Sequence, residues 1–401
     1  MGGFCLVNSS GYIYNKREQI TARSLRVNEK INTIIMNCDE KGAISKAAVT
    51  LRKGGLVAFP TETVYGLGAD ALNPEASNKI YTAKGRPSDN PLIVHIADTY
   101  AVYKLASQVP QKAVMLMEAF WPGPLTMILP KKDIVPDETT GGLDTVAIRM
   151  PSHPAALDMI RQSQLYIAAP SANISGRPSP TTAEHVISDM DGRIDMILDG
   201  GAVGIGIEST IVDMTGDVPV ILRPGFITKA MLENIVGTVT VDKALTDNIP
   251  DVKPKAPGMK YTHYAPKGEL TIVELSDETG ADDNSTNEHA RQKQVLSSNY
   301  ITRLSVAKKI NALVAEKKLQ GFKTAVIASA ENAHLYNCEN ILIAGEAASG
   351  ETIAAKLYGI LRECDDIGAE YIYSEAFHHG KLGNAIMNRL LKAAGQRVIK
   401  V

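Results

Sequence analysis

The stretch Lys84-Gly-Arg-Pro-Ser-Asp-Asn-Pro-Leu-Ile-Val-His95 decides how this chain is interpreted. Two prolines end the helical pattern before it, and an apolar run that suits a buried strand follows them directly. Lys84 and Arg86 place two cations at the mouth of that strand. Ammonium and guanidinium groups are the side chains that neutralise clustered phosphate oxygens. The stretch therefore predicts an α/β fold and makes a nucleotide-handling enzyme the leading hypothesis.

Strands and helices alternate on both sides of this stretch, which indicates an α/β domain over residues 33–245. Several predicted strands are joined by connections too short for a crossover helix, so we expect a twisted, open sheet of mixed direction. The expected helices cover residues 42–53, 75–83, 111–120, 154–162 and 182–190, and the expected strands cover residues 33–36, 56–59, 92–96, 125–129, 145–150, 165–168, 194–198, 210–213 and 220–222.

A second, smaller α/β pattern over residues 269–401 predicts a Rossmann-like domain. Residues 246–268 lie between the two patterns and carry four prolines up to Pro266, so they are interpreted as a linker. Residues 1–32 are expected to form a poorly ordered leader. In the second domain, strands are expected at 270–274, 324–328, 341–344 and 371–374, helices at 306–318, 351–364 and 383–394, and a polar segment at 276–298.

The composition describes a globular chain of 401 residues, long enough for two domains. A formal charge of −2 gives no strongly basic surface of the kind that binds nucleic acid without regard to sequence. The four cysteines are scattered without a CxxC pair, so neither a zinc site nor a disulfide framework is expected, and a cytoplasmic location fits best. No apolar run approaches the roughly 20 residues needed to cross a bilayer.

Polar residues follow the strand at 56–59 and surround the one at 92–96. The hydroxyls of Thr61 and Thr63 suit a polar ligand, although an ordinary turn is as good an explanation. Lys84 and Arg86 alone would most often form a solvated basic turn, but Asn90 and His95 beside them favour a phosphate site. His95 lies on an apolar strand, where a core histidine is the first interpretation and a ligand contact the second.

Two loops of small and hydroxyl residues complete the candidate set. Ser171, Asn173 and Ser179 lie in a segment where small residues let a ligand approach the backbone closely. Ser209 ends a glycine-containing loop whose G-x-G is weak evidence, because no G-x-G-x-x-G follows. Arg149, at a strand end, is a further cation. Four motifs are absent from the sequence, and each absence excludes one class of enzyme. Without a P-loop the chain is not a P-loop ATPase, and without HExxH it is not a zincin. Without a GxSxG motif it is not a hydrolase with a nucleophile elbow, and without a carboxylate pair it is not a glycosidase.

Together these segments resemble the YrdC-type L-threonylcarbamoyladenylate synthases, in the longer form that carries an additional C-terminal domain. The resemblance runs from about residue 34 to residue 400 and does not cover the leader. Its motifs lie at residues 59–68, 84–86, 90–95, 121–125, 146–151, 169–173, 208–210, 222–225 and 257–266.

The resemblance implies a nucleotidyltransferase that joins L-threonine, bicarbonate and ATP into threonylcarbamoyl-AMP and releases pyrophosphate. The product would pass to a tRNA threonylcarbamoyl transferase complex, for modification of tRNAs that read ANN codons. Such chemistry needs reactants to be positioned and phosphoryl charge to be stabilised, and it needs no side-chain nucleophile. Mg²⁺ would be held chiefly by the ATP phosphates. Direct binding of double-stranded RNA is expected to be weak or absent, and no binding to a membrane is expected.

The resemblance also assigns roles to residues. Lys84 and Arg86 would be catalytic, and Tyr264, together with His263 or Tyr261, would make the linker a lid over the site. The nucleotide would be contacted by Lys84, Arg86, Asn90, Thr145, Ser171, Asn173, Ser179, Arg223 and Tyr264. The threonine would be held by Thr61 or Thr63, by His95, Arg149 and Ser209, with Arg149 as the partner of its carboxylate.

Two other functions compete with this interpretation. An RNA-binding or ribosome-maturation module would use a basic cavity for structured RNA, with steep salt dependence and no need of threonine. A carbamoyl-transfer enzyme acting on another substrate is the second alternative. The role of the C-terminal domain stays open, although residues 345–350 and 378–380 suggest a second ligand site as much as a regulatory part.

Overall fold

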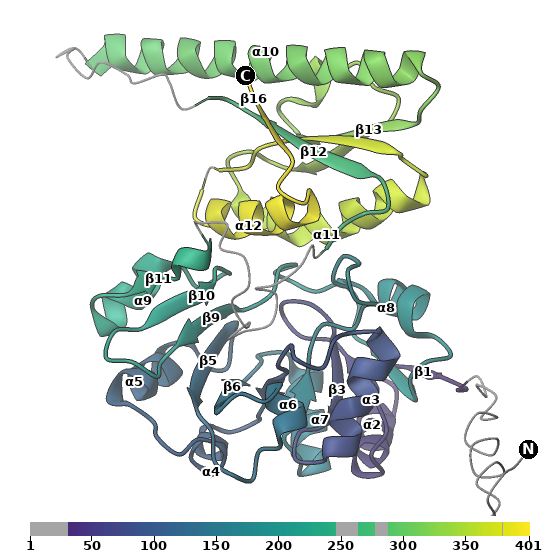
Figure 1. Ribbon diagram of the computed structural model, residues 1–401, viewed down its shortest axis with the longest axis vertical. Helices are drawn as coiled ribbons and strands as arrows, with labels where there is room; N and C mark the ends of the chain where they lie inside the picture. Colours follow the sequence, from purple (N-terminus) through teal and green to yellow (C-terminus); the bar gives the residue numbers. More distant parts are fainter. Residues whose placement is uncertain (1–30, 246–263, 277–287, 379) are drawn as a thin grey trace, which may run out of the picture.

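The computed structural model describes residues 31–245, 264–276, 288–378 and 380–401. The predicted leader therefore lies almost wholly outside the described residues, as do Tyr261 and His263 of the proposed lid. Two α/β units are stacked along the long axis of the molecule (Figure 1). No helix among these residues is long and apolar enough to cross a membrane.

The first unit is built on a sheet whose neighbouring strands run both parallel and antiparallel, as the short connections predicted. The pairs β2–β3, β5–β6 and β9–β10 are antiparallel, whereas β1–β8, β4–β6 and β5–β9 are parallel. The eleven strands lie in the order β1 (Ile34–Asn37), β8 (Met196–Asp199), β2 (Val57–Phe59), β3 (Gly66–Asp70), β7 (Ile167–Ala169), β4 (Ile93–His95), β6 (Thr145–Arg149), β5 (Leu125–Pro130), β9 (Thr210–Asp213), β10 (Val220–Arg223) and β11 (Thr240–Val241).

Helices cover both faces of this sheet, and the longer ones present an apolar stripe to it. On α2, Ala43, Ala47 and Leu51 recur at helical spacing and are fully buried, and they share one core with residues of α7. A larger core lies against the other helices. The helices of this unit are α2 (Ala43–Arg52), α3 (Pro74–Lys84), α4 (Val102–Leu105), α5 (Gln111–Phe120), α6 (Asp137–Thr140), α7 (Pro154–Ser163), α8 (Ala183–Met190) and α9 (Lys229–Val236).

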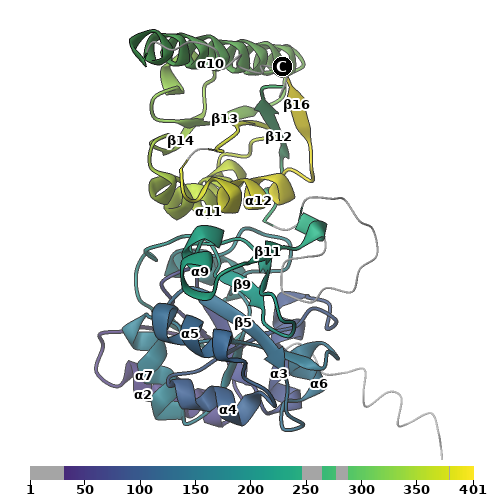
Figure 2. The ribbon, with the colours of Figure 1, turned by 90° about the vertical axis from the view of Figure 1, so that its left-hand side faces the viewer.

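The second unit is a parallel sheet with helices on both faces, which confirms the Rossmann-like prediction. Its strands lie in the order β14 (Ile341–Gly345), β13 (Thr324–Ser329), β15 (Tyr371–Glu375), β12 (Glu269–Glu274) and β16 (Val398–Lys400). Helix α10 (Glu288–Leu319) lies on the outer face. Helices α11 (Gly350–Asp366) and α12 (Gly383–Ala393) lie between this sheet and the first unit (Figures 1 and 2).

The sequence analysis did not predict α4, α6, α9, β11 or β16, and three further details differ from its expectations. Residues 66–70, where no strand was expected, form strand β3: Gly68 lets the chain approach Phe59, since a Cβ there would lie 2.9 Å from the Phe59 ring. Lys84, expected in a loop, is the last residue of α3, which ends at Gly85 with φ of 62°. Helix α10 begins at Glu288, within the segment predicted only to be polar, because Glu, Ala, Arg, Gln and Lys there all favour helix.

Candidate functional site

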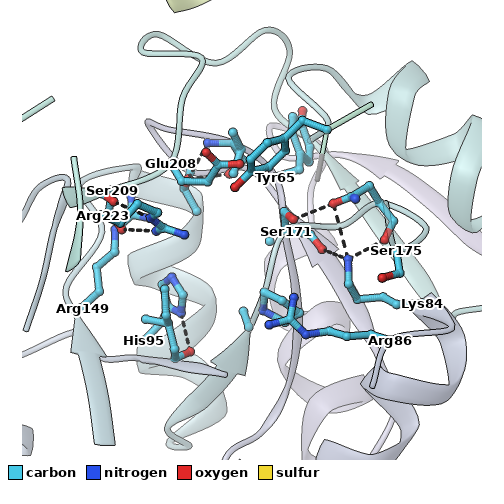
Figure 3. Close-up of a pocket in the computed structure, with 18 of the residues that line it drawn as sticks. Tyr65, Lys84, Arg86, His95, Arg149, Ser171, Ser175, Glu208, Ser209 and Arg223 are labelled. Carbon is cyan, nitrogen blue, oxygen red and sulfur yellow. Dashed lines mark hydrogen bonds between the residues drawn. The ribbon is translucent and has the colours of Figure 1, made fainter. Parts of the chain in front are cut away.

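A cavity opens where the central strands of the first sheet end (Figure 3). Most residues predicted for the site line this one cavity, although their segments lie far apart in the sequence. The predicted residues along its wall are Thr61, Lys84, Arg86, His95, Arg149, Ser171, Asn173, Ser209, Arg223 and Tyr264.

Strand register explains why three of these side chains meet. His95 of β4 pairs with Arg149 of β6, Arg149 with Thr126 of β5, Thr126 with Ile211 of β9, and Ile211 with Arg223 of β10. Residues directly opposite one another in neighbouring strands point to the same face. One row across five strands therefore carries an imidazole, a hydroxyl and two guanidinium groups along one side of the cavity.

A β-bulge turns Arg223 toward the cavity. Leu222 packs in the small apolar cluster on the cavity face, so strict alternation would send Arg223 to the opposite face. The register of β10 against β9 shifts between Ile221 and Arg223, which leaves two residues of β10 opposite one of β9. Bulges of this kind re-aim side chains beside functional sites. Arg223 then donates from Nε and Nη2 to the carbonyl and hydroxyl of Ser209, at 3.0 and 3.1 Å.

Lys84 lies opposite this row and is almost completely buried. Its ammonium donates to the carbonyl oxygens of Ser171 and Asn173 and, at 3.4 Å, to the side-chain oxygen of Asn173. All of these partners are neutral. Burial, followed by the positive charge of Arg86, holds the pKa of Lys84 well below its usual value. A phosphate group in the cavity would supply the negative charge that the protein does not place there.

Arg86 has the weakest internal bonding among these cations. Its Nη2 lies 3.4 and 3.3 Å from the carbonyl oxygens of Asn90 and Pro91, and its Nε is shielded from solvent with no hydrogen-bond partner among the described residues. Burial lowers the pKa of Arg86 to about 10. Guanidinium groups form forked bonds with phosphate oxygens, so Arg86 has both the position and the unused donor for such a contact.

Arg149 is held by a carboxylate that the sequence analysis did not single out. Its Nη2 lies 2.7 Å from Oε1 of Glu62, whose Oε2 accepts a bond from the backbone N–H of Ser152. Burial raises the pKa of Glu62, but the charge and hydrogen bond of Arg149 and two backbone hydrogen bonds together outweigh burial, so the pKa of the carboxyl falls below its usual value. The Nε of Arg149 has no partner among the described residues. Glu62 thus orients the guanidinium of Arg149 through Nη2, while Nε stays available to donate a hydrogen bond to a ligand.

His95 is buried and neutral. Its Nδ1 lies 3.0 Å from the carbonyl oxygen of Ile93, and its ring meets Phe59 edge to face at 6.0 Å. Burial, reinforced by the charge of Arg149, lowers the pKa of His95 to about 3. Both interpretations of His95, as a core histidine and as a ligand contact, are compatible with this position, because the residue packs within the sheet while its ring lines the cavity.

Acidification should destabilise the protein through His95. The folded state keeps this imidazole neutral, whereas the unfolded state takes up a proton below pH 6.5, so stability is lost as the pH falls from 6.5 toward 3. Between pH 7 and pH 5 the loss attributable to His95 is about 2 kcal/mol. Urea unfolding should therefore show a smaller loss over this interval in His95→Gln than in the wild type. His334→Gln, at an exposed position, should retain the wild-type loss.

Four predicted residues do not line the cavity. Thr63 is buried beneath its wall, with its hydroxyl 3.0 Å from that of Thr61. The side-chain oxygen of Asn90 is buried without a partner among the described residues. Thr145 begins the strand that Arg149 ends, about 13 Å away along β6. Ser179 lies behind the wall and donates to Oε1 of Glu208 at 2.6 Å.

Several residues of the site were missed by the sequence analysis. Glu208 is the one lining carboxylate among the described residues, and Tyr65 and Ser175 also face the cavity. Thr126 supports the wall, with its hydroxyl 2.7 Å from that of Ser209. Glu62 follows Thr61 and Glu208 precedes Ser209 in the sequence, and both neighbours were predicted site residues. This adjacency was the sequence signal that could have identified the two carboxylates.

Tyr264 is the first described residue of the linker and closes the cavity on one side. It is 7% exposed, adopts a left-handed backbone with φ of 68°, and its ring lies 5.0 Å from that of Tyr358 in α11. The backbone N–H of Ala265 donates to the carbonyl of Gly176, next to the loop that Lys84 binds. The end of the proposed lid is therefore tied to the cavity wall.

No group of three or more His, Cys, Asp or Glu residues in the described part of the chain is placed to hold a metal ion. A second cavity lies in the second unit beyond the ends of β12 and β15. Glu274, Glu375, Ala347 and His378 line it, so both segments suspected of a second ligand site border the same hollow. His379 lies outside the described residues.

Comparisons with known proteins agree with this architecture. Residues 49–225 match a family named for Sua5, YciO and YrdC and described as "Telomere recombination". Residues 227–395 match the "Threonylcarbamoyl-AMP synthase, C-terminal domain" family.

Relatives of full and of half length are known. The threonylcarbamoyl-AMP synthase of Bacillus subtilis is 49% identical over 89% of this chain and 94% of its own length. The crystal structure of Pyrococcus abyssi Sua5 complexed with L-threonine superposes with a TM-score of 0.79 and 44% identity, covering 92% of this chain and 99% of that one. A Pseudomonas putida threonylcarbamoyl-AMP synthase is 36% identical over 45% of this chain and 97% of its own length, so it is too short to contain both units.

Proposed function

This chain belongs to the threonylcarbamoyl-AMP synthases that carry a Sua5-type second domain, and from that premise we propose how its cavity binds and joins the substrates. The enzyme is a nucleotidyltransferase that uses ATP, and its product serves threonylcarbamoyladenosine modification of tRNA. The observation that supports the proposal most directly is that Lys84, Arg86, Arg149 and Arg223 line one cavity, where Glu208 is the only lining carboxylate among the described residues.

The two sides of the cavity suit the two substrates. Lys84 and Arg86 lie beside the Ser171–Asn173 loop and would bind the phosphates of ATP, with Arg223 and Tyr264 as further nucleotide contacts. Arg149, beside His95 and Ser209, would bind the carboxylate of L-threonine. The crystal structure of the Pyrococcus abyssi relative in complex with L-threonine supports an amino-acid site in this fold.

The reaction needs the protein mainly for positioning. Bicarbonate and the threonine amine condense to a carbamate with loss of water. A carbamate oxygen then attacks the α-phosphorus, the bond between the α-phosphorus and the bridging oxygen breaks, and pyrophosphate leaves with that oxygen. Lys84 and Arg86 would stabilise the charge that grows on the phosphoryl oxygens. No side-chain nucleophile takes part, and the product would pass to a tRNA threonylcarbamoyl transferase that acts on tRNAs reading ANN codons.

The residues around the cavity do not fit a protein-held metal ion. Glu208, the lining carboxylate, is already bonded to Ser179, Tyr358 and Arg389. Mg²⁺ is therefore proposed to enter as part of the MgATP substrate, bound by phosphate oxygens and water.

Pyrophosphate release tests the function and the role of the metal together. Release should require ATP, L-threonine and bicarbonate, and it should stop when any one is omitted. EDTA should abolish turnover without changing the unfolding midpoint of the ligand-free enzyme, because no resident metal is expected. Release with other amino acids, or none with threonine, would contradict the proposed substrates. A lower midpoint in EDTA would contradict the absence of a resident metal.

A further inference from the structure

The wall of the ATP and threonine cavity is also the docking surface of the second domain. Val64, which lines the cavity, and Ile207 belong to the same apolar core as Leu357 and Tyr358 of α11. Gly206 lies so close to this helix that a Cβ would be 2.4 Å from the carbonyl oxygen of Ala354. The loop that leads to Glu208 and Ser209 is thus shaped by α11.

Two side chains of the second domain bind the lining carboxylate directly. The hydroxyl of Tyr358 lies 2.9 and 2.7 Å from the two oxygens of Glu208, and Nε of Arg389 donates to Oε2 at 3.1 Å. Tyr358 and Arg389 have no measurable exposure, and Glu208 is 6% exposed. A carboxylate this deeply buried is stable only with such partners.

Arg389 also ties together two backbone segments that carry site residues. Its Nη2 donates to the carbonyl of Glu208 at 3.3 Å, and its Nη1 donates to the carbonyl of Pro224. The residues next to those carbonyls are Ser209 and Arg223, which are bonded to each other. A guanidinium has five donors in a fixed planar arrangement, so it can hold two segments at one spacing as a lysine cannot.

We propose that Tyr358 and Arg389 are positioning residues of the active site, through which the second domain sets the geometry of Glu208, Ser209 and Arg223. They touch neither substrate and act through the residues they hold. The second domain is then a part of the catalytic site in this chain, whereas relatives of half length must fix the same wall by other means. This inference rests on the proposed function of the cavity.

The same interface contains a second arginine contact, whose partners do not line the cavity. Arg362 of α11 is 4% exposed and donates to Asp189 of α8 at 2.8 Å and to the carbonyl of Pro178. Asp189 accepts at 3.3 Å from the backbone N–H of Ile174, next to the lining residue Asn173, so its link to the cavity is one residue more remote than that of Glu208. If Arg389 served only to dock the second domain, substitutions of Arg389 and Arg362 would change the KM values to the same extent. Tyr336 provides a control for Tyr358, since its hydroxyl donates to the buried Glu375 within the second domain.

The test compares full-length Arg389→Lys with Arg362→Lys and Tyr358→Phe with Tyr336→Phe. Arg389→Lys should raise the KM values for ATP and threonine about tenfold, and Tyr358→Phe about threefold or more, since each loses a hydrogen bond to a charged group. Arg362→Lys and Tyr336→Phe should lower the unfolding midpoint with KM values within about twofold of the wild type. Equal KM changes within either pair would overturn the proposal, and Tyr358→Phe decides alone if Arg389→Lys does not fold.

The experiment also distinguishes a failure of the proposed function from a failure of the positioning role. If the wild type releases no pyrophosphate with threonine and bicarbonate, the substrates are wrong, and the rise in unfolding midpoint on adding ATP becomes the readout. A rise that is smaller in Tyr358→Phe than in Tyr336→Phe would support the positioning role. Equal rises in those two variants would overturn it.

Discussion

Arg86→Met is expected to lower kcat/KM for ATP by about 10²–10³, the usual effect of removing one preorganised donor from a developing negative charge. The ligand-free variant should nevertheless unfold at the same temperature as the wild type or above it. The reason is that Arg86 makes only two long bonds to carbonyls, and its buried Nε has no partner among the described residues. A buried donor without a partner costs about 1–3 kcal/mol, which the apolar side chain does not incur.

Two further variants make this expectation specific. Arg86→Lys keeps the charge but loses the planar arrangement of donors, so it should recover only part of the lost activity. Arg161→Met removes an exposed arginine of α7 that pairs with Asp158 at 3.0 Å, and it should leave kcat/KM unchanged. Steady-state pyrophosphate release and thermal unfolding are sufficient measurements. Near-normal kcat/KM in Arg86→Met would show that the guanidinium does not contact the phosphates.

A loss of activity together with unchanged stability is typical of a residue retained for its ligand. Lys84 is expected to behave differently, although both residues belong to the same K-x-R motif. Its ammonium binds the carbonyl oxygens of Ser171 and Asn173, so its removal would also release the loop that forms this side of the cavity. Lys84 and Arg86 are thus both cations, but the structure of the cavity wall depends on Lys84 more than on Arg86.

The sequence allowed the fold class and most of the cavity wall to be predicted. Apolar runs such as residues 56–59 and 125–129 and helical spacing such as that of Ala43, Ala47 and Leu51 are local signals, and the structure follows them. The long first half of α10 was missed because it has no apolar periodicity. Strand β3 was missed because its glycines, Gly66 and Gly68, are normally signs of a turn and here allow close packing on Phe59.

The side-chain contacts of the site residues could not be predicted, since they depend on the register of the strands and on how the second domain packs against the first. The pairing of His95 with Arg149, and of Arg149 with Thr126, is a property of strand order, which the sequence does not state. The same holds for Arg223, whose direction depends on a bulge against β9. Glu62 and Glu208 gained their importance only from the arginines that the fold places against them.

Arg149→Met is expected to raise the KM for threonine by about 10²–10³, while the KM for ATP changes by no more than a few-fold. Two charge-assisted bonds to a carboxylate contribute about 3–5 kcal/mol together, which accounts for that factor. The variant should also be less stable, because Glu62 remains buried without its cation. Removing one partner of a buried pair costs about 3–5 kcal/mol, and the 14% exposure of the Glu62 side chain places this pair toward the lower value.

A double variant separates the two effects. Glu62→Gln combined with Arg149→Met removes the uncompensated charge, so it should recover most of the lost stability without recovering affinity for threonine. The pH dependence distinguishes the two proteins as well. In the wild type, Arg149 lowers the pKa of Glu62, so the stability that this carboxyl contributes is present above pH 4.5 and is lost on acidification.

In Arg149→Met, burial is the largest remaining influence and is opposed by the backbone hydrogen bonds of Glu62 and Ser152, so the pKa of Glu62 should rise and the sign of its pH dependence should reverse. That variant should be destabilised more at pH 8 than at pH 5, whereas the double variant should not show this difference. Urea unfolding at the two pH values, with threonine titrations of pyrophosphate release, measures both properties. An unchanged KM for threonine in Arg149→Met would mean that Glu62 neutralises the guanidinium for structural reasons, and that another cation of the cavity binds the amino acid.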